Sequence, residues 1–539
     1  MLNFPALRQG IRLPPSGWML AGLLTLYVLA GLFGRDPWKG EDAIHIGSAW
    51  QMLSGGDWLA PMLAGRPFHE PPLYYWSAAV SGALFGGILP VHDALRLASG
   101  FWVALTLAAL YYAGRELHGP QHAAAAPLLL AGTVGLVLHA HDAQPMLVAL
   151  AAYAGSIGAG ALMARKAALA GLLYGLSLAA CLLGAGLAPS LPLLAIAPFA
   201  WYFSRPRRQA AHTLLLGVLL AALLVAPWLL ALEHYHPGRL NAWLNTELAP
   251  LRTPFSLNGL ASFSSLLLLF AFPTLPLALW SLWQQRKQPG HPAQLLPLTL
   301  FFLTLLLLAW AYRPREIPAL LLLPPLALLA TPGALSLRRG AANAFDWFAM
   351  SLFSLLALLV WVAWSAMALD FPPRLAQRVV ELRPGFNGEF KLLHFALALA
   401  VSLWWLWLIL TAPRSPYRSL THWSLGFTTF WLLATTLILP WFDYGRSYRP
   451  VAEAVAQALP AHPSCLAERG LSPGQRASLA YFSNLSPLDF TTPTGRQCAW
   501  LLVVGDQTHE LSAPDARWQL VWQGNRPGER REKFRLFRR

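Results

Sequence analysis

The chain has 539 residues, of which 56% are hydrophobic and only 12% are charged. Soluble globular chains carry about 25% charged residues, so this composition excludes an ordinary soluble protein. The net charge of +15 does not indicate nucleic acid as a partner, because the basic residues lie in short loops between apolar segments. Continuous apolar runs predict an all-α polytopic membrane protein and exclude a β-barrel, whose strands alternate.

The N-terminal segment predicts an uncleaved membrane anchor. Residues 1–16 carry Arg8 and Arg12 ahead of the apolar segment 17–34. Positive charge in front of a long apolar span favours a cytoplasmic N-terminus. We therefore expect residues 1–444 to form the membrane domain, with the loop that follows the first span on the outer face.

Basic loops recur along the membrane domain and predict its topology. They fall at Arg115 with His118, Arg165–Lys166, Arg205–Arg208, Arg286–Lys287, Arg338–Arg339 and Arg414–Arg418. If all these loops are cytoplasmic, the chain must cross the membrane an even number of times between one basic loop and the next, and between the N-terminus and the first of them. This holds only if segment 73–89, which starts with Tyr74, Tyr75 and Trp76, does not cross. We expect 73–89 and the amphipathic 42–53 to be interfacial helices in the outer leaflet.

The remaining apolar segments give about thirteen spans and place the C-terminus outside. Prolines at 145, 192, 227 and 273 predict kinks. The loop 233–259 is expected to cover a ligand, and 370–390 to form an amphipathic surface helix. The predicted spans are 17–34, 95–114, 121–141, 143–163, 167–185, 188–203, 210–232, 260–283, 294–312, 317–334, 343–369, 391–411 and 420–440.

Residues 445–539 are polar and predict a small external α/β domain. The runs 499–506, 518–523 and 533–539 read as strands, and 450–459 reads as a helix. Cys465 and Cys498 either pair in an oxidising compartment or stay as two buried thiols, and the external placement favours pairing. Cys181 lies in a span and is interpreted as a packing residue.

The loop after the first span, within residues 35–94, is the candidate catalytic region. It holds Glu41, Asp42, Asp57 and Glu70, four of the chain's 24 acidic residues. An acidic pair at the end of a span is costly unless it is hydrated or used. Glu41 or Asp42 suits a general base that takes a proton from an acceptor. The alternative is that Asp42 caps the helix that follows it.

Other polar clusters are predicted at the same membrane depth. His69 and Glu70 are candidate ligands for a divalent metal ion, or else part of a hydrated turn. Asp142, with His139 and His141, forms a second cluster that we expect to share a cavity with the first. A third comprises Arg313, Arg315 and Glu316, whose guanidinium groups either bind a lipid phosphate or anchor the helix end; we favour phosphate.

Several motifs together resemble a known family. The acidic pair at 41–42 is followed by SGGDWLAP at 54–61 and FHEPPLYYW at 68–76. HAHDAQP occupies 139–145, and Arg315-Glu316-Ile317 leads to LPPLA at 323–327. This pattern is similar to the bacterial aminoarabinose transferase and protein O-mannosyltransferase superfamily of GT-C glycosyltransferases. The resemblance covers the layout of the membrane region and the placement of the C-terminal domain.

The resemblance implies roles for these residues. Glu41 and Asp42 fall on the family's acidic pair, which implies the catalytic base, although their order is reversed here. Glu70 falls on a position implied in metal or substrate coordination. Arg313, Arg315, Glu316, Asp142 and Tyr74 are candidate substrate-binding and phosphate-binding residues. Loop 233–259 has Asn245-Thr246-Glu247 where the family has a His motif.

The predicted function is transfer of a sugar from a polyprenyl-phosphate donor to a cell-envelope acceptor such as lipid A. The resemblance implies a bacterial inner-membrane hexosyl- or pentosyltransferase, similar to glycosyltransferase families 39 and 83, that works by one inverting displacement. Apart from a divalent ion at the candidate metal site, no cofactor is expected. The alternatives are a flippase or transporter of a lipid-linked sugar, and a structural assembly partner. Transporters show repeats and broken midplane helices, whereas here the acids gather at one membrane face.

Overall fold

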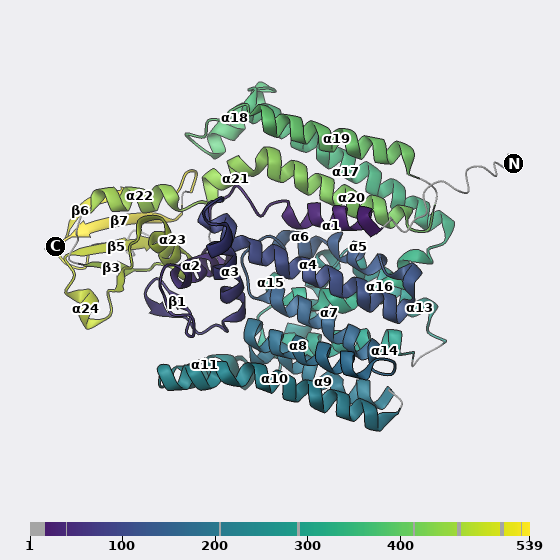
Figure 1. Cartoon of the computed structure of the whole chain (residues 1–539). Helices are drawn as coiled ribbons and strands as arrows, with labels where there is room; N and C mark the ends of the chain where they lie inside the picture. The colour runs from purple at the N-terminus through teal and green to yellow at the C-terminus, as the bar shows by residue number, and fades with distance from the viewer. Residues whose placement is uncertain are drawn as a thin grey trace.

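The structure of the protein, a computed structural model, consists of a block of apolar helices with a smaller mixed domain at one end (Figure 1). Helices α2 (Glu41–Leu53) and α3 (Leu73–Phe85) lie between the two parts. The predicted class, a polytopic helical membrane protein with a small C-terminal sheet domain, is confirmed. The structure describes residues 17–38, 40–203, 206–287, 291–412, 415–460, 465–506, 511–529 and 531–539.

Eight helical segments of the described chain are long and apolar enough to cross a membrane, and each coincides with one predicted span. Four are single helices in the first 311 residues: α4 (Val91–His118), α8 (Ala167–Ala185), α10 (Arg207–Tyr235) and α14 (Pro292–Ala311). Two more are the single helices α17 (Arg339–Ala368) and α19 (Leu392–Thr411). The segment Glu316–Leu335 is built from α15 (Glu316–Ala319), η4 (Leu320–Leu322) and α16 (Leu323–Leu335). The segment Arg418–Arg446 is built from α20 (Arg418–Leu433), the π-helical η5 (Ala434–Ile438) and α21 (Leu439–Arg446).

The other five predicted spans are helical but short or broken. Three are the apolar helices α1 (Gly17–Leu29), α7 (Met146–Leu162) and α9 (Leu187–Phe203). The span predicted at 121–141 is split into α5 (Ala125–Ala131) and α6 (Val134–His139), and that at 260–283 into α12 (Leu257–Phe270) and α13 (Thr274–Gln284). α12 and α13 meet at 103° beside Pro273, where the missing N–H interrupts helical bonding.

The number of crossings and the orientation of the chain stay predictions, because helix length and composition do not define a membrane. Arg8, Arg12, Arg205 and Arg414, on which part of the topology argument rests, lie outside the described residues. α3 ends at Phe85 and has 13 residues. At 1.5 Å per residue it is about 20 Å long, shorter than a hydrocarbon core of about 30 Å, so the structure agrees with an interfacial helix.

The two long loops predicted to lie outside also contain helices. α11 (Arg239–Leu248) forms within 233–259 and is followed by the short η3 (Pro250–Arg252). α18 (Pro373–Leu382) forms within 370–390 and is strongly amphipathic, with Leu375, Val380 and Leu382 exposed on its apolar side. The predicted helix in this loop is confirmed.

The C-terminal domain contains a five-stranded sheet in the order β4-β3-β5-β7-β6. β3 is parallel to β4 and β5, and β7 is antiparallel to β5 and β6. The three predicted strands and the first helix are present, and the Cys465–Cys498 disulfide is formed. Two strands were not predicted. The elements are α22 (Arg449–Ala458), β3 (Leu466–Arg469), α23 (Pro473–Ser483), β4 (Leu488–Asp489), α24 (Pro493–Arg496), β5 (Trp500–Gly505), β6 (Gln519–Gly524) and β7 (Lys533–Arg538).

The C-terminal domain contacts the first loop through ion pairs and through close packing of α23 against α2. Arg449 binds the Asp36 carboxylate through two nitrogens, with Nε 2.9 Å from Oδ2. Arg66, in the small hairpin of β1 (Met62–Leu63) and β2 (Arg66–Pro67), donates to Glu468 at 2.8 Å. α2 packs against α23 so closely that a Cβ at Gly47 would lie 2.8 Å from the Ala477 Cβ. The domain therefore supports one side of α2.

We predict that Gly47→Ala loosens this contact. The added methyl group has no room, and overpacking of this kind costs about 1–3 kcal/mol. The midpoint of thermal unfolding of the detergent-solubilised protein should fall. Gly22→Ala is the matched control, because a Cβ at that helical glycine meets nothing within 4 Å. An unchanged midpoint for Gly47→Ala would show that the α2–α23 contact does not support the fold.

Candidate functional site

A buried carboxylate, Asp42, ties three separate segments together at the start of α2. Its side chain is only 4% exposed. Oδ2 accepts from Arg35 Nη1 at 3.1 Å and from Arg96 Nη2 at 3.1 Å, and Oδ1 accepts from Arg96 Nε at 3.2 Å. The backbone N–H groups of Trp38 and Ala143 also donate to it, at 3.2 and 2.8 Å. Both oxygens are therefore fully occupied.

The two arginines extend this network, which we call the Asp42 clamp (Arg35, Asp42, Asp93, Arg96 and Asp142). Arg35 Nη2 donates to Asp142 Oδ1 at 2.7 Å, and Arg96 Nη1 donates to Asp93 Oδ1 at 2.9 Å. Burial alone would raise the pKa of the Asp42 carboxyl, but the guanidinium groups of Arg35 and Arg96 outweigh it and hold that pKa well below its usual range. The clamp joins the first loop, α4 and the 139–145 segment.

This geometry argues against Asp42 as the catalytic base. A base needs a free lone pair that is directed at substrate. Asp42 has none, because both of its oxygens accept hydrogen bonds from arginines and backbone N–H groups. It is not simply a helix cap either, since its partners come from α4 and the 139–145 segment as well as from its own turn.

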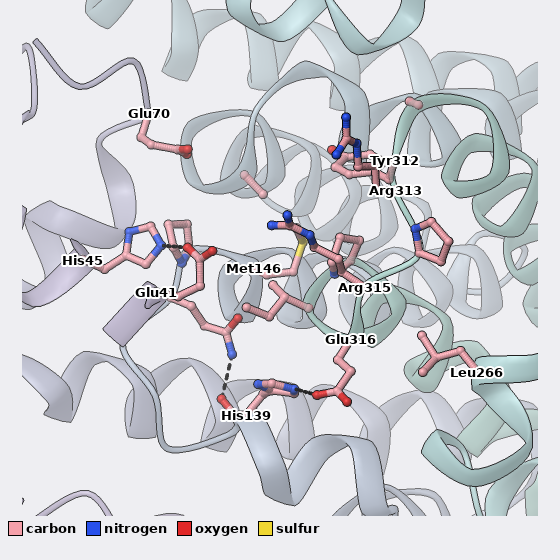
Figure 2. A pocket seen from close by; sticks show the side chains of 17 residues that line it. Glu41, His45, Glu70, His139, Met146, Leu266, Tyr312, Arg313, Arg315 and Glu316 are labelled. Carbon is pink, nitrogen blue, oxygen red and sulfur yellow. Dashed lines mark hydrogen bonds and ion pairs between the residues drawn. The ribbon is translucent and has the colours of Figure 1, made fainter. Parts of the chain in front are cut away.

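Next to the clamp lies a cavity of ≈ 870 Å³, which we call the donor cavity. Figure 2 shows acidic side chains on one side of it and two arginines on the other. Residues from three distant polar clusters line this one cavity, whereas Asp42 and Asp142 do not. Its polar lining residues are Glu41, His45, Glu70, His139, Gln144, Tyr312, Arg313, Arg315 and Glu316.

Glu41 reaches the donor cavity from the first turn of α2. Its side chain is 45% exposed, in contrast to that of Asp42. His45, one helical turn later, lies with Nε2 3.2 Å from Glu41 Oε2 and with Nδ1 2.7 Å from the Tyr75 hydroxyl. In the neutral tautomer the Tyr75 hydroxyl donates to Nδ1 and Nε2 donates to Glu41. The hydrogen bond from His45 lowers the pKa of Glu41, so this carboxyl is ionised at neutral pH.

Glu70 points into the same cavity from the loop before α3 (Figure 2). Burial, together with the nearby Glu247 and Glu41 carboxylates, raises the pKa of Glu70 to about 8. Glu70 is therefore mostly protonated at neutral pH. The site thus holds two acids in different states: Glu41 is charged and Glu70 is neutral.

The residues near Glu70 do not fit a metal site. His69 is not among the residues that line the donor cavity. Within the described ranges, no three His, Cys, Asp or Glu side chains gather as metal ligands. The pair at 69–70 lacks a third ligand, whereas protein metal sites use three or more.

The arginines opposite the acids are available to a ligand. Arg313 and Arg315 follow α14 and both line the cavity. Figure 2 shows the Arg315 side chain extended toward Glu41 and Arg313 beside Tyr312. Neither arginine makes a hydrogen bond or ion pair with any residue that the structure describes. The neighbouring Glu316 is turned to the other side, where its Oε2 accepts from His139 Nε2 at 2.9 Å. Two unpaired guanidinium groups in one wall suit an anion such as phosphate.

The structure does not bring Tyr74 to the donor cavity. Its ring is fully buried, and its hydroxyl donates to Ser99 Oγ at 2.8 Å. The Ser99 hydroxyl in turn donates to the Asp142 backbone carbonyl at 2.9 Å. Because α3 packs on α4, the Tyr74 side chain is directed into the protein interior. There it supports the backbone at Asp142 through the Ser99 hydroxyl. Asp142 lies in the clamp, outside the lining of the donor cavity.

Some site residues were missed by sequence reasoning. His45 follows Glu41 by four residues, and that spacing on a helix places both side chains on one face. Arg96 is a fully buried arginine inside an apolar span, which is itself a signal of function or of pairing. Tyr312 lies next to Arg313 and had no distinguishing pattern.

Comparison with known proteins confirms the predicted resemblance and fold. No family model matches the chain. An undecaprenyl phosphate-α-4-amino-4-deoxy-L-arabinose arabinosyl transferase from Sodalis glossinidius is 32% identical over 229 residues, which are 41% of this chain and 40% of that protein. The chain therefore spans less than half of that relative.

The solved structures extend the likeness to nearly the full length. ArnT from Cupriavidus metallidurans in the apo state matches with a TM-score of 0.68 and 17% identity, over 97% of this chain and 98% of that one. The same protein bound to undecaprenyl phosphate matches with a TM-score of 0.65 and 16% identity, over the same shares. At this identity the likeness establishes the fold.

We predict that Asp42→Asn destabilises the protein, whereas Glu41→Gln does not. The Asn amide cannot neutralise Arg35 and Arg96, and leaving buried charge uncompensated costs about 3–5 kcal/mol. Thermal unfolding in detergent should show a lower midpoint for Asp42→Asn only. If Asp42→Asn unfolded like the parent protein and lost only activity, Asp42 would be the catalytic base and the clamp interpretation would be wrong.

Proposed function

We propose that this protein is an integral membrane glycosyltransferase that moves a sugar from a polyprenyl-phosphate donor to a cell-envelope acceptor such as lipid A. One observation carries this proposal: a single cavity places two unpaired guanidinium groups opposite an ionised and a neutral carboxyl group. In a phosphate-linked sugar, the phosphate can pair with the guanidinium groups while the sugar lies against the carboxyl groups. The relatives support the same reading through their names and through the undecaprenyl phosphate bound by the Cupriavidus protein.

Arg313 and Arg315 form the phosphate end of the donor cavity. Guanidinium groups pair with phosphate oxygens through charge-assisted hydrogen bonds. Leu266 and Ile317 line the same side and give apolar contact for the first units of a polyprenyl chain. Farther along α12, Leu268 and Leu269 are exposed, which leaves an apolar path for the rest of the chain toward lipid.

The acidic end of the cavity favours a sugar that carries an amino group. Glu41 and Glu70 face the space opposite the arginines, with Glu247 nearby. An ammonium substituent would stabilise the ionised form of Glu70 and lower its pKa from about 8. The relatives named for 4-amino-4-deoxy-L-arabinose agree with this proposal. The donor is then a molecule with a negative phosphate and a positive sugar.

The proposed reaction is one displacement with inversion. The acceptor oxygen forms a bond to the anomeric carbon and gives its proton to the Glu41 carboxylate. The bond from that carbon to the phosphate oxygen breaks, and polyprenyl phosphate leaves with the electron pair. Arg313 and Arg315 stabilise the charge on the leaving phosphate. His45, held by the Tyr75 hydroxyl, orients Glu41. Asp42 is a positioning residue, because Arg35, Arg96 and two backbone N–H groups occupy both of its carboxylate oxygens.

The cellular placement is part of the proposal. The chain is a multi-pass membrane protein, and we place it in the bacterial inner membrane with a cytoplasmic N-terminus. Residues 445–539 would then form the periplasmic domain, and 35–94 the catalytic loop. The Cys465–Cys498 disulfide supports the external placement of the domain, because structural disulfides are favoured in oxidising compartments.

The function is tested by incubating purified protein with an undecaprenyl-phosphate aminosugar and lipid A. A transferase releases undecaprenyl phosphate and yields a glycosylated acceptor. A flippase moves the donor between leaflets of a vesicle without releasing it. Movement without release would overturn the proposal in favour of transport.

We predict that Glu41→Gln lowers the transfer rate by about 10²- to 10⁴-fold, the usual contribution of a general base. Binding of undecaprenyl phosphate should change little, since the arginines are intact. Glu381→Gln is the control, because that carboxyl is exposed on α18 and pairs only with Arg378 among the described residues. If Glu41→Gln kept the full rate of transfer, Glu41 would not be the base.

We also predict that binding of an aminosugar donor at pH 7 releases close to one proton. Glu70, with a pKa of about 8, is protonated in the free protein and should ionise next to the ammonium group. Calorimetry in buffers of different ionisation enthalpy measures this release. It should vanish in Glu70→Gln and with a donor whose sugar is neutral. Equal proton release in Glu70→Gln would assign the titration to another group.

A further inference from the structure

A second cavity of ≈ 460 Å³ lies beside the donor cavity. The two share Glu41, His139 and Ile317, so the proposed base stands in the wall between them. Trp38 of the first loop, with Asp42 and Asp142 of the clamp, lines the second cavity. Further lining comes from far along the chain, from Arg383 after α18, from Arg446 at the end of α21, and from the C-terminal domain.

The C-terminal domain closes this cavity through Arg526 and Glu529. Arg526 is held in place: its Nε lies 3.1 Å from Glu532 Oε2, its Nη2 lies 3.2 Å from Glu529 Oε2, and its Nη1 donates to the Gly445 carbonyl at 3.0 Å. Arg383 donates to the Pro527 carbonyl at 3.2 Å. The domain is therefore docked on the membrane helices at this cavity.

Arg446 differs from these two arginines because its guanidinium group donates to no carboxylate or carbonyl group of the described residues. Its guanidinium group lies over the rings of Trp38 and Phe442, 4.9 and 5.5 Å from their centroids. It makes no hydrogen bond or ion pair with the residues that the structure describes, although Asp142 lies in the same cavity. A cation that rests on aromatic rings at a cavity wall keeps all its N–H donors for a ligand.

We infer that this second cavity binds the acceptor, and that Arg446 holds an anionic group of that acceptor. The inference rests on the proposed function. It places the acceptor and the donor in neighbouring cavities that share Glu41, so that the acceptor oxygen can approach the anomeric carbon on the face opposite the leaving phosphate while Glu41 takes its proton. The acceptor oxygen bonds to the anomeric carbon, its proton passes to Glu41, and polyprenyl phosphate leaves with the electrons of the broken bond.

The surroundings indicate that the acceptor is a lipid with a phosphate group. Arg383 directly follows α18, whose exposed Leu375, Val380 and Leu382 form an apolar strip. α18 lies at the end of α17 and α19, next to α21 (Figure 1). An amphipathic helix of this kind lies at a membrane surface and offers acyl chains a place next to the cavity. Guanidinium groups favour phosphate because its oxygens accept two parallel hydrogen bonds.

The test compares Arg446→Gln, Arg446→Lys and the parent protein with lipid A as the acceptor probe. We expect kcat/KM for lipid A to fall about 10- to 100-fold in Arg446→Gln, the loss expected for one charge-assisted hydrogen bond, and less in Arg446→Lys. Affinity for undecaprenyl phosphate and the unfolding midpoint should stay unchanged. Arg378→Gln is the control, since that arginine is exposed on α18 and bonds to Glu381.

A second experiment uses lipid A from which the phosphate groups have been removed. The parent protein should use it poorly, and Arg446→Gln should lower that residual activity no further. Inorganic phosphate should compete with lipid A in the parent protein but should not receive sugar. If Arg446→Gln keeps the parent KM for lipid A, or loses undecaprenyl phosphate binding instead, the acceptor assignment is wrong. If the parent protein transfers sugar to no acceptor, the proposed function fails.

Discussion

The arrangement of the site depends on one buried carboxylate between two guanidinium groups. In a chain with 12% charged residues, the Asp42 clamp brings together Arg35, Arg96, Asp93 and Asp142 within hydrogen-bonding distance. Burying charge is costly unless every group is paired, so this network tolerates few alternative geometries. It sets where α2 begins relative to α4 and to the 139–145 segment. The cavity lies against the segments that it joins.

The position of Glu41 follows from that constraint. Successive residues of a helix point about 100° apart, so the Asp42 carboxylate is buried between the clamp arginines while the Glu41 carboxylate stays exposed to both cavities. The C-terminal domain supports the same helix from the other side, where Gly47 of α2 meets Ala477 of α23. α2 is therefore held between α4 and α23. A base that must stand between two substrates needs this kind of rigid support, because small displacements of a reacting group slow a reaction strongly.

Much of the architecture could be predicted from the sequence, because apolar runs and basic loops follow directly from membrane physics. The convergence of the 41–42, 70 and 313–316 segments was also accessible, through motif spacing. The sequence could not predict that Glu41 stays exposed to the cavities while Asp42 pairs with arginines, since adjacent acids differ only in the side of the helix that each occupies. Nor could it predict the second cavity: Trp38 and Arg446 meet only through tertiary packing, and nothing local marks Arg446 as unpaired.

The distribution of unpaired charge links the two cavities to the proposed chemistry. Some arginines of the site are neutralised: Arg35 and Arg96 by the clamp, and Arg526 by Glu529 and Glu532. Arg313, Arg315, Arg383 and Arg446 have no carboxylate partner among the residues that the structure describes, and they line the two cavities that share Glu41. Of these four, Arg383 donates to the Pro527 carbonyl. A structural arginine gains stability from a partner, so free guanidinium groups in two cavities that share one carboxylate indicate two anionic ligands. Two phosphate-bearing lipids, one in each of the cavities that share Glu41, satisfy this charge pattern and place the base within reach of the acceptor oxygen of an inverting transfer.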